Sequence, residues 1–141
     1  MRPRLLLVED DQAHRDLMLE AIRQLEDIDV AVAQSGQDAV RQLKELELGG
    51  ARTAPAAVFL DLSMPGGLTG FDVLRELRDI AAARRTPVVV FTASDRDVDV
   101  YLTYRLGANA FVVKPDEPEA FKQVVKLAAQ FWLHTNVLPP T

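Results

Sequence analysis

The sequence of 141 residues predicts an α/β fold in three layers: a doubly wound, five-stranded parallel sheet between two layers of helices. Two observations predict it. Short apolar runs alternate with longer segments in which apolar residues recur every three or four positions, which is the pattern of βα units. Glycine, proline and serine residues separate many of these segments. Right-handed crossovers between parallel strands then place helices on both faces of the sheet.

The first part of the chain contains three predicted strands, at residues 4–8, 29–33 and 57–61. Asp11 is expected to cap the first helix, and Ser35-Gly36 turns into the second. Apolar residues at helical spacing define these two helices: Leu17, Met18, Ala21, Ile22 and Leu25 in the first, and Ala39, Val40, Leu43 and Leu46 in the second. Gly49-Gly50 is expected to end the second helix.

The second part of the chain continues the alternation. A turn rich in glycine and proline (residues 64–70) precedes a helix with Val73, Leu74, Leu77 and Ile80. The remaining elements are a strand at 88–91 opened by Pro87, a helix at about 96–106 closed by Gly107, a strand at 110–113 and a helix at about 117–133. We expect one domain over residues 1–134, an irregular tail over 135–141 and no output domain.

Composition limits the possible functions. The absence of cysteine excludes disulfides and thiolate metal sites. The formal net charge is −5 and basic residues form no long stripe, so a nucleic-acid partner is not expected. Apolar runs are too short to span a bilayer and no signal peptide is recognisable, which predicts a cytoplasmic protein without a membrane partner.

Polar residues follow four of the predicted strands. Glu9 and Asp10 come after the first strand, Asp61 ends the third, Thr92 follows the fourth, and Lys114 follows the fifth. In an open parallel sheet, ligands bind beyond the carboxyl ends of the strands, near the point where the strand order reverses. These side chains are therefore expected to share one rim of the sheet.

The chemistry of this set points to phosphoryl transfer. Clustered carboxylates repel one another, and an oxygen-only set without histidine or cysteine suits Mg²⁺ or Mn²⁺. Asp61 is the candidate nucleophile, while Lys114 and Thr92 can stabilise phosphoryl oxygens. Since the sequence lacks a GxxxxGK[ST] loop, the phosphoryl donor is expected to be another phosphorylated molecule.

Four motifs resemble those of response-regulator receiver domains, a family with a flavodoxin-like, CheY-like (βα)5 fold. They are LLLVEDD (residues 5–11), FLDLSMP (59–65), VFTA (90–93) and GANAFVVKP (107–115). The resemblance covers nearly the whole chain, with the motifs in the family's order. It implies a phospho-accepting signalling domain rather than an enzyme, one that catalyses its own phosphorylation and dephosphorylation and takes its phosphoryl group from a histidine kinase.

The resemblance also implies a metal site and an acceptor. Asp10 is expected to bind Mg²⁺ directly, Glu9 through water, and the backbone carbonyl of Ser63 as a further ligand beside the acceptor Asp61.

It further implies a phosphate-binding and switching set. Lys114 and the Ala93 backbone N–H are expected to contact the phosphoryl group, and the Lys114–Pro115 bond to be cis. Thr92 resembles the switch hydroxyl, and Phe111 the switch aromatic.

Two longer connections depart from minimal receivers. The loop at 64–70 is one residue longer than usual, and the connection at 49–55 is also extended. With the ending of the chain, the second connection is similar to that of stand-alone receivers that partner phytochrome-type histidine kinases. The last helix has apolar residues on both sides, among them Leu127, Phe131, Trp132 and Leu133. This excess predicts a homodimer formed through the fourth helix, the fifth strand and the last helix.

Other interpretations remain open at this level. An aspartyl-phosphate phosphatase usually carries a second Asp two residues after its nucleophile, where this chain has Ser63. A flavodoxin-like cofactor binder would need a phosphate loop in place of the acids after the first strand. A receiver that no longer takes phosphate is a third alternative, and Phe111 alone could be a core residue. His14 and His134 are predicted to be surface residues and not phosphotransfer sites.

Overall fold

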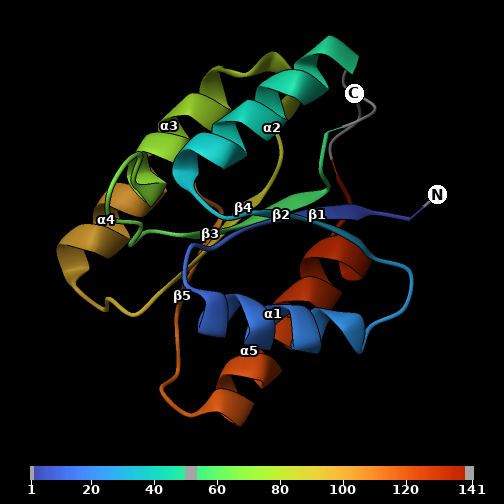
Figure 1. Ribbon diagram of the computed structural model, residues 1–141, viewed down its shortest axis with the longest axis vertical. Coiled ribbons are helices and arrows are strands. Elements are labelled where there is room, and N and C mark those ends of the chain that lie inside the picture. Colours follow the sequence, from blue (N-terminus) through green and yellow to red (C-terminus); the bar gives the residue numbers. More distant parts are fainter. Residues whose placement is uncertain (1, 50–53, 139–141) are drawn as a thin grey trace.

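The computed structural model describes residues 2–49 and 54–138, which form one parallel sheet with helices on both sides (Figure 1). The strands are β1 (Arg4–Val8), β2 (Asp29–Ala33), β3 (Ala57–Asp61), β4 (Val88–Thr92) and β5 (Ala110–Val113). They lie in the order β2-β1-β3-β4-β5, and every neighbouring pair is parallel. The predicted doubly wound fold is confirmed, with four strands at the predicted bounds and β4 one residue longer.

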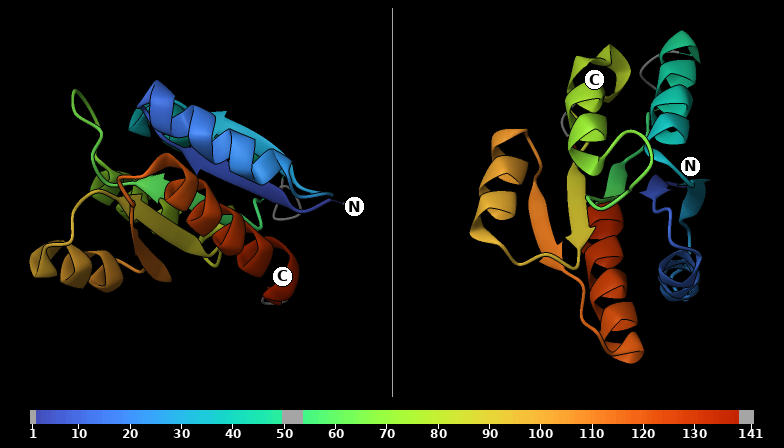
Figure 2. Two further views of the ribbon diagram at one scale, coloured as in Figure 1. Left: turned by 90° about the horizontal axis from the view of Figure 1, so that it is seen from below. Right: turned by 60° about the vertical axis from the view of Figure 1, so that its left-hand side comes forward.

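The helices are α1 (Gln12–Arg23), α2 (Gly36–Gly49), α3 (Gly70–Asp79), α4 (Asp97–Arg105) and α5 (Pro118–Gln130). Helices α1 and α5 pack side by side on one face of the sheet, and α2 and α3 on the other, while α4 lies beside β5 (Figures 1 and 2). The last helix ends earlier than predicted, since residues Phe131–Thr135 continue it as a π-helical turn, η3. A short 3₁₀ turn, η2 (Ala81–Ala83), was not predicted because three residues carry no periodicity.

Two apolar cores sandwich the sheet. Successive strand residues point to opposite faces, so Leu5 and Leu7 enter the core under α1 and α5, whereas Leu6 and Val8 enter the core under α2 and α3. These four side chains are at most 3% exposed. A strand buried on both faces has to be apolar throughout, which is why periodicity and composition located β1 so well.

Local signals fix the ends of several helices. The Asp11 carboxylate accepts a hydrogen bond from the backbone N–H of His14 and caps α1, as predicted. Thr69 and Asp72 form a reciprocal capping box at the start of α3. Gly107, with φ of +101°, follows α4 in the conformation expected of a terminating glycine. Helix α2 reaches Gly49, whereas Gly50 and the end of the tail (residues 139–141) lie outside the described residues.

The strand order positions the functional rim. Because β1 lies between β2 and β3, the chain reverses its direction of travel across the sheet at the β1–β3 boundary. The carboxyl ends of these two strands carry Glu9 and Asp61, so the crevice predicted by the strand order is lined with carboxylates. No helix in the described part of the chain is long and apolar enough to cross a membrane.

Candidate functional site

Three carboxylates converge at the β1–β3 crevice. Glu9, Asp10 and Asp61 each place one oxygen within 4.8 Å of the others. Glu9 is fully buried and Asp61 is only 5% exposed. The structure thus brings these three predicted residues together at one place.

Lys114 joins this cluster from the end of β5. Its ammonium lies 2.6 Å from Glu9 Oε1 and 3.7 Å from Asp61 Oδ1, and the lysine itself is 8% exposed. The Lys114 backbone N–H donates to the Thr92 carbonyl oxygen at 2.7 Å, which ties the β5 end to β4. A buried ion pair of this kind costs desolvation on both sides, so removing either partner alone would leave an uncompensated charge.

The cluster retains an excess of negative charge, because one ammonium faces three carboxylates. Burial raises the pKa of Asp61 from 3.8 to about 7, with repulsion from Glu9 adding to the effect and Lys114 and the Ser63 N–H opposing it. Bringing a divalent cation to the crevice would relieve this repulsion. Oxygen ligands, high negative charge and partial access at Asp10 are the donor set that Mg²⁺ and Mn²⁺ prefer, so these residues fit the predicted metal.

The loop after β1 is held in place by its own hydrogen bonds. The Arg15 guanidinium donates to the carbonyl oxygens of Glu9 and Asp10, at 3.1 and 3.3 Å. The Asp11 backbone N–H donates to Glu9 Oε2 at 3.3 Å. These contacts fix the direction in which the acidic pair leaves the strand.

Thr92 ends β4 on the other side of Asp61. Asp61 of β3 lies opposite Phe91 of β4, and Thr92 is the next residue of β4. Thr92 is 2% exposed. Thr92 Oγ1 accepts a hydrogen bond from the Ser94 N–H at 3.3 Å, and Ser94 Oγ donates to Asp99 of α4 at 2.5 Å. The hydroxyl is thus linked through one loop residue to α4. Ala93, between them, is exposed.

Two predicted residues have environments that leave their roles as predictions. The Ser63 backbone N–H donates to Asp61 Oδ1 at 3.2 Å, which holds the acceptor carboxylate, while its carbonyl remains a predicted ligand. Phe111 is partly buried against the core under α2 and α3, and its switch role remains a prediction.

The predicted cis bond at Lys114–Pro115 is wrong, because the described residues contain no cis peptide bond. The trans form is the favoured state of a peptide bond even before proline.

His14, predicted to be a surface residue and not a phosphotransfer site, lies at the edge of the acidic cluster. Its Nδ1 lies 2.9 Å from Lys114 Nζ and 3.8 Å from Glu9 Oε1, and its side chain is 42% exposed, so it borders the site. A sequence signal existed: His14 lies in the first turn of the helix that follows the first strand, which starts at the ligand-binding edge. His134 is exposed as predicted, with its Nε2 3.1 Å from the Glu26 carbonyl oxygen.

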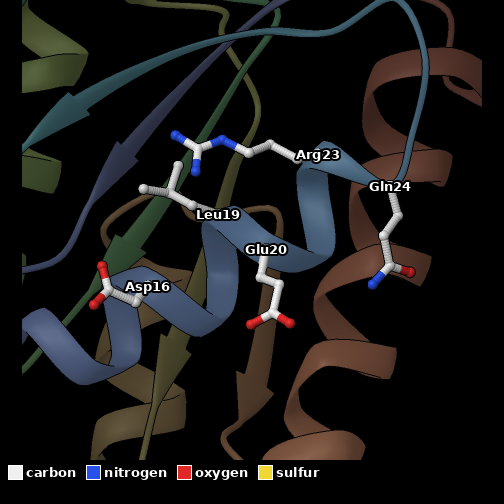
Figure 3. Close-up of a pocket in the computed structure, with 5 residues that line it drawn as sticks. All are labelled: Asp16, Leu19, Glu20, Arg23 and Gln24. Carbon is white, nitrogen blue, oxygen red and sulfur yellow. The ribbon is translucent and has the colours of Figure 1, made fainter.

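A separate hollow lies along α1 (Figure 3). Its volume is about 410 Å³, and it is lined by Asp16, Leu19, Glu20, Arg23 and Gln24. All five residues belong to α1 or to the residue after it, and none is in the acidic cluster. The hollow is a surface feature of one helix, distinct from the crevice.

Comparison with known proteins identifies similar sequences and structures. Residues 5–126 match the family described as Response regulator receiver domain. The chain is 34% identical over 136 residues to the probable methanogenesis regulatory protein FilR2 of Methanothrix harundinacea, covering 96% of this chain and 86% of that protein. It is 37% identical over 119 residues to the DNA-binding response regulator MtrA of Mycolicibacterium smegmatis, covering 84% of this chain and 47% of MtrA. The chain thus spans only about half the length of MtrA.

Two solved structures closely match the fold. The phosphorylated cyanobacterial phytochrome response regulator RcpA superposes with a TM-score of 0.89 at 30% identity, covering 99% of this chain and 100% of that one. The Mn²⁺-bound response regulator Rcp1 superposes with a TM-score of 0.86 at 29% identity, covering 98% and 99%. Since the family match extends over most of a chain that carries the acidic crevice, this chain belongs to the response regulator receiver domains, the phospho-accepting signalling domains of two-component systems.

Proposed function

We propose that Asp61 accepts a phosphoryl group from a phosphohistidine of a histidine kinase, in a reaction that depends on Mg²⁺ or Mn²⁺. One observation carries this proposal: Glu9, Asp10 and Asp61 converge within 4.8 Å at the strand-order reversal, with the buried Lys114 ammonium beside them. A carboxylate nucleophile, a cation site and a fixed ammonium are the components that phosphoryl transfer to an aspartate requires.

The transfer exchanges one bond to phosphorus for another. A carboxylate oxygen of Asp61 attacks phosphorus, the P–N bond of the phosphohistidine breaks, and the imidazole leaves and takes up a proton. Lys114 lies 3.7 Å from Asp61 Oδ1, close enough to pair with a phosphoryl oxygen after a small movement. The Thr92 hydroxyl and the Ala93 N–H are the further donors that we assign to the phosphoryl group. In the separate hydrolytic step, water attacks phosphorus, the bond from phosphorus to the Asp61 oxygen breaks, and inorganic phosphate and the Asp61 carboxylate are released.

The metal is assigned to Asp10, Asp61 and the Ser63 carbonyl, with Glu9 as a ligand through water. A bound Mg²⁺ would neutralise charge on the phosphoryl oxygens. That the structural neighbour Rcp1 has a Mn²⁺-bound form supports a divalent cation in this chain.

The output of the switch is assigned to the α4–β5–α5 face. Thr92, at the end of β4, and Phe111, on β5, would move when the phosphoryl group arrives and so shift the population between two states of this face. Large apolar side chains are exposed on it, among them Tyr101 at 64%, Tyr104 at 49%, Val113 at 44% and Leu127 at 57%.

We propose that this face forms a homodimer. Sedimentation equilibrium of the wild type and Val113→Lys tests this: a wild type that stays monomeric at high concentration, with and without phosphorylation, contradicts it.

The partner is assigned as a histidine kinase, and a phytochrome-type kinase is our specific proposal. It rests on the sequence features of the chain's ending and on the likeness to RcpA, a phytochrome response regulator. The cytoplasmic location and the single-domain organisation stay predictions.

Incubation with acetyl phosphate and Mg²⁺, followed by intact-mass measurement, tests the proposed function. The wild type should gain the mass of one phosphoryl group, and chelation of Mg²⁺ should abolish the gain. Asp61→Asn should gain nothing, whereas Asp79→Asn, an exposed acid at the end of α3, should behave as the wild type. An Asp61→Asn protein that is still phosphorylated to the same extent would exclude Asp61 as the acceptor.

A further inference from the structure

We propose that His14 is a positioning residue for Lys114: its Nδ1 accepts a hydrogen bond that holds the lysine ammonium between Glu9 and Asp61. This inference rests on the proposed role of Asp61 and adds a residue from α1 to its surroundings. His14 and Lys114 are separated by 100 positions in the sequence and meet only through the fold.

The geometry around the ammonium distributes its three N–H groups. Glu9 Oε1 lies 2.6 Å from Lys114 Nζ, His14 Nδ1 lies at 2.9 Å, and Asp61 Oδ1 lies at 3.7 Å. In the proposed arrangement the two short contacts engage two donors, and the third remains available on the side of Asp61, 3.7 Å away, where an added phosphoryl oxygen would need a partner.

The proposed contact requires one tautomer of His14. A lysine ammonium has three donors and no acceptor, so the facing Nδ1 has to present its lone pair. The ring N–H of His14 then lies on Nε2, and Nδ1 is the acceptor in the proposed hydrogen bond.

Contacts from two helices hold the imidazole. The His14 backbone N–H donates to Asp11 Oδ1 at 2.9 Å, which anchors the residue in the first turn of α1. Its ring stands edge-on to Phe121 of α5, with centroids 5.7 Å apart and planes at 81°. Phe121 is 2% exposed and its centroid is 5.9 Å from Lys114 Nζ. Phe121 of α5 therefore lies beside both the His14 ring and the Lys114 ammonium.

Loss of the acceptor would release the ammonium. Lys114 is 8% exposed, so an N–H without a partner would be costly, and the ammonium would turn toward the remaining carboxylates. The donor reserved for the phosphoryl group would then be misdirected. We expect the maximal phosphorylation rate to fall by about three- to tenfold, the effect of losing one hydrogen bond to a charged group at a half-exposed position.

Two substitutions separate hydrogen bonding from packing. His14→Asn keeps an acceptor near the position of Nδ1, whereas His14→Phe keeps an aromatic ring against Phe121 without an acceptor. The rate of phosphorylation by phosphoramidate, measured at saturating Mg²⁺, should fall in His14→Phe and stay near the wild-type rate in His14→Asn. In a Lys114→Met background, His14→Phe should have no further effect. A normal rate in His14→Phe, or equal losses in both variants, would overturn the proposal.

A second measurement does not require phosphorylation. Long-range ¹H–¹⁵N spectra of the unphosphorylated protein report the Nδ1 and Nε2 shifts of both histidines. Lys114→Met should move the His14 Nδ1 signal and leave His134 unchanged. An unmoved His14 signal would contradict the contact even if Asp61 is phosphorylated normally, and a moved signal in a protein that takes up no phosphoryl group would count against the proposed function alone.

Discussion

At the scale of single residues, the site depends on how charge is buried. Glu9, Asp61 and Lys114 are each less than a tenth exposed, yet only one of the three is a cation. The resulting rise in the pKa of Asp61 to about 7 makes the metal-free acceptor partly protonated near neutral pH. Metal binding and acceptor ionisation should therefore be linked in this chain.

The stability of the metal-free protein should depend on pH through Asp61. Between about pH 4 and pH 7 the folded state retains the Asp61 proton that the unfolded state has lost. The stability that protonated Asp61 contributes is thus fully present below about pH 4 and is lost as the pH rises to about 7. Since Asp61→Asn stays neutral, its stability relative to the wild type should increase across this range, with a slope of at most about 1.4 kcal/mol per pH unit.

Urea unfolding in the presence of a chelator measures this difference. Asp79→Asn serves as the control, since it makes the same substitution at an exposed residue at the end of α3. Added Mg²⁺ should stabilise the wild type by binding the folded state and should reduce the advantage of Asp61→Asn. A constant advantage over the whole pH range would contradict the buried environment of Asp61.

At the scale of elements, the start of α3 is packed directly against the acceptor strand. The Gly70 N–H donates to the Leu62 carbonyl oxygen at 3.2 Å. A Cβ at Gly70 would lie 2.3 Å from the Asp61 carbonyl oxygen and 2.5 Å from the Leu62 Cα. Both neighbours are backbone atoms, so the end of β3 could admit a side chain only by moving.

Gly70→Ala should therefore impair both stability and phosphorylation. We expect a loss of about 1–3 kcal/mol, the usual cost of overpacking, together with a slower phosphorylation of Asp61. Gly66→Ala is the matched control: its φ of +89° strains an alanine, but nothing lies within 4 Å of the added Cβ. It should lose stability while keeping the phosphorylation rate. Urea unfolding and intact-mass time courses measure the two effects, and a normal rate in Gly70→Ala would refute the role of this contact.

The loop after β3 should also set the lifetime of the phosphoryl group. Ser63 is exposed and its backbone N–H donates to Asp61 Oδ1, so a larger side chain at this position is expected to hinder an attacking water. Ser63→Leu should slow dephosphorylation by about tenfold, equivalent to about 1.4 kcal/mol in the barrier, whereas Ser63→Ala should not. Ser94 offers the equivalent test after β4. Equal decay rates for Ser63→Leu and the wild type in a stopped-flow assay would reject this idea.

At the scale of the whole molecule, the parts predicted from sequence are those that local pattern determines. Short apolar runs located every strand, and parallel strands required the residues at their ends to share a rim, which brought Glu9, Asp10, Asp61 and Lys114 together. What sequence could not supply is pairing between side chains from distant elements. His14 and Lys114 lie on different elements, and neither carries a local signal of the other.

The ends of helices were harder to predict for a related reason. The continuation of α5 into the π-helical turn η3 keeps the apolar spacing of a helix, so periodicity could not separate the two. The cis bond at Lys114–Pro115 rested on the family resemblance alone, and the structure contradicts it. The roles of the metal ligands, the switch pair and the dimer face are expressed only when a metal ion, a phosphoryl group or a second copy is bound. Sequence and fold supply the positions of these residues.

Locating the phosphoryl group on the chain tests the central claim most directly. After incubation with phosphoramidate and Mg²⁺, borohydride reduction converts a phosphorylated aspartate to homoserine, which peptide mass spectrometry can locate. We predict homoserine at position 61 and at no other position, with none in the absence of Mg²⁺. Homoserine at another aspartate, or a stable phosphoryl group on His14, would contradict the assignment of Asp61 as the acceptor.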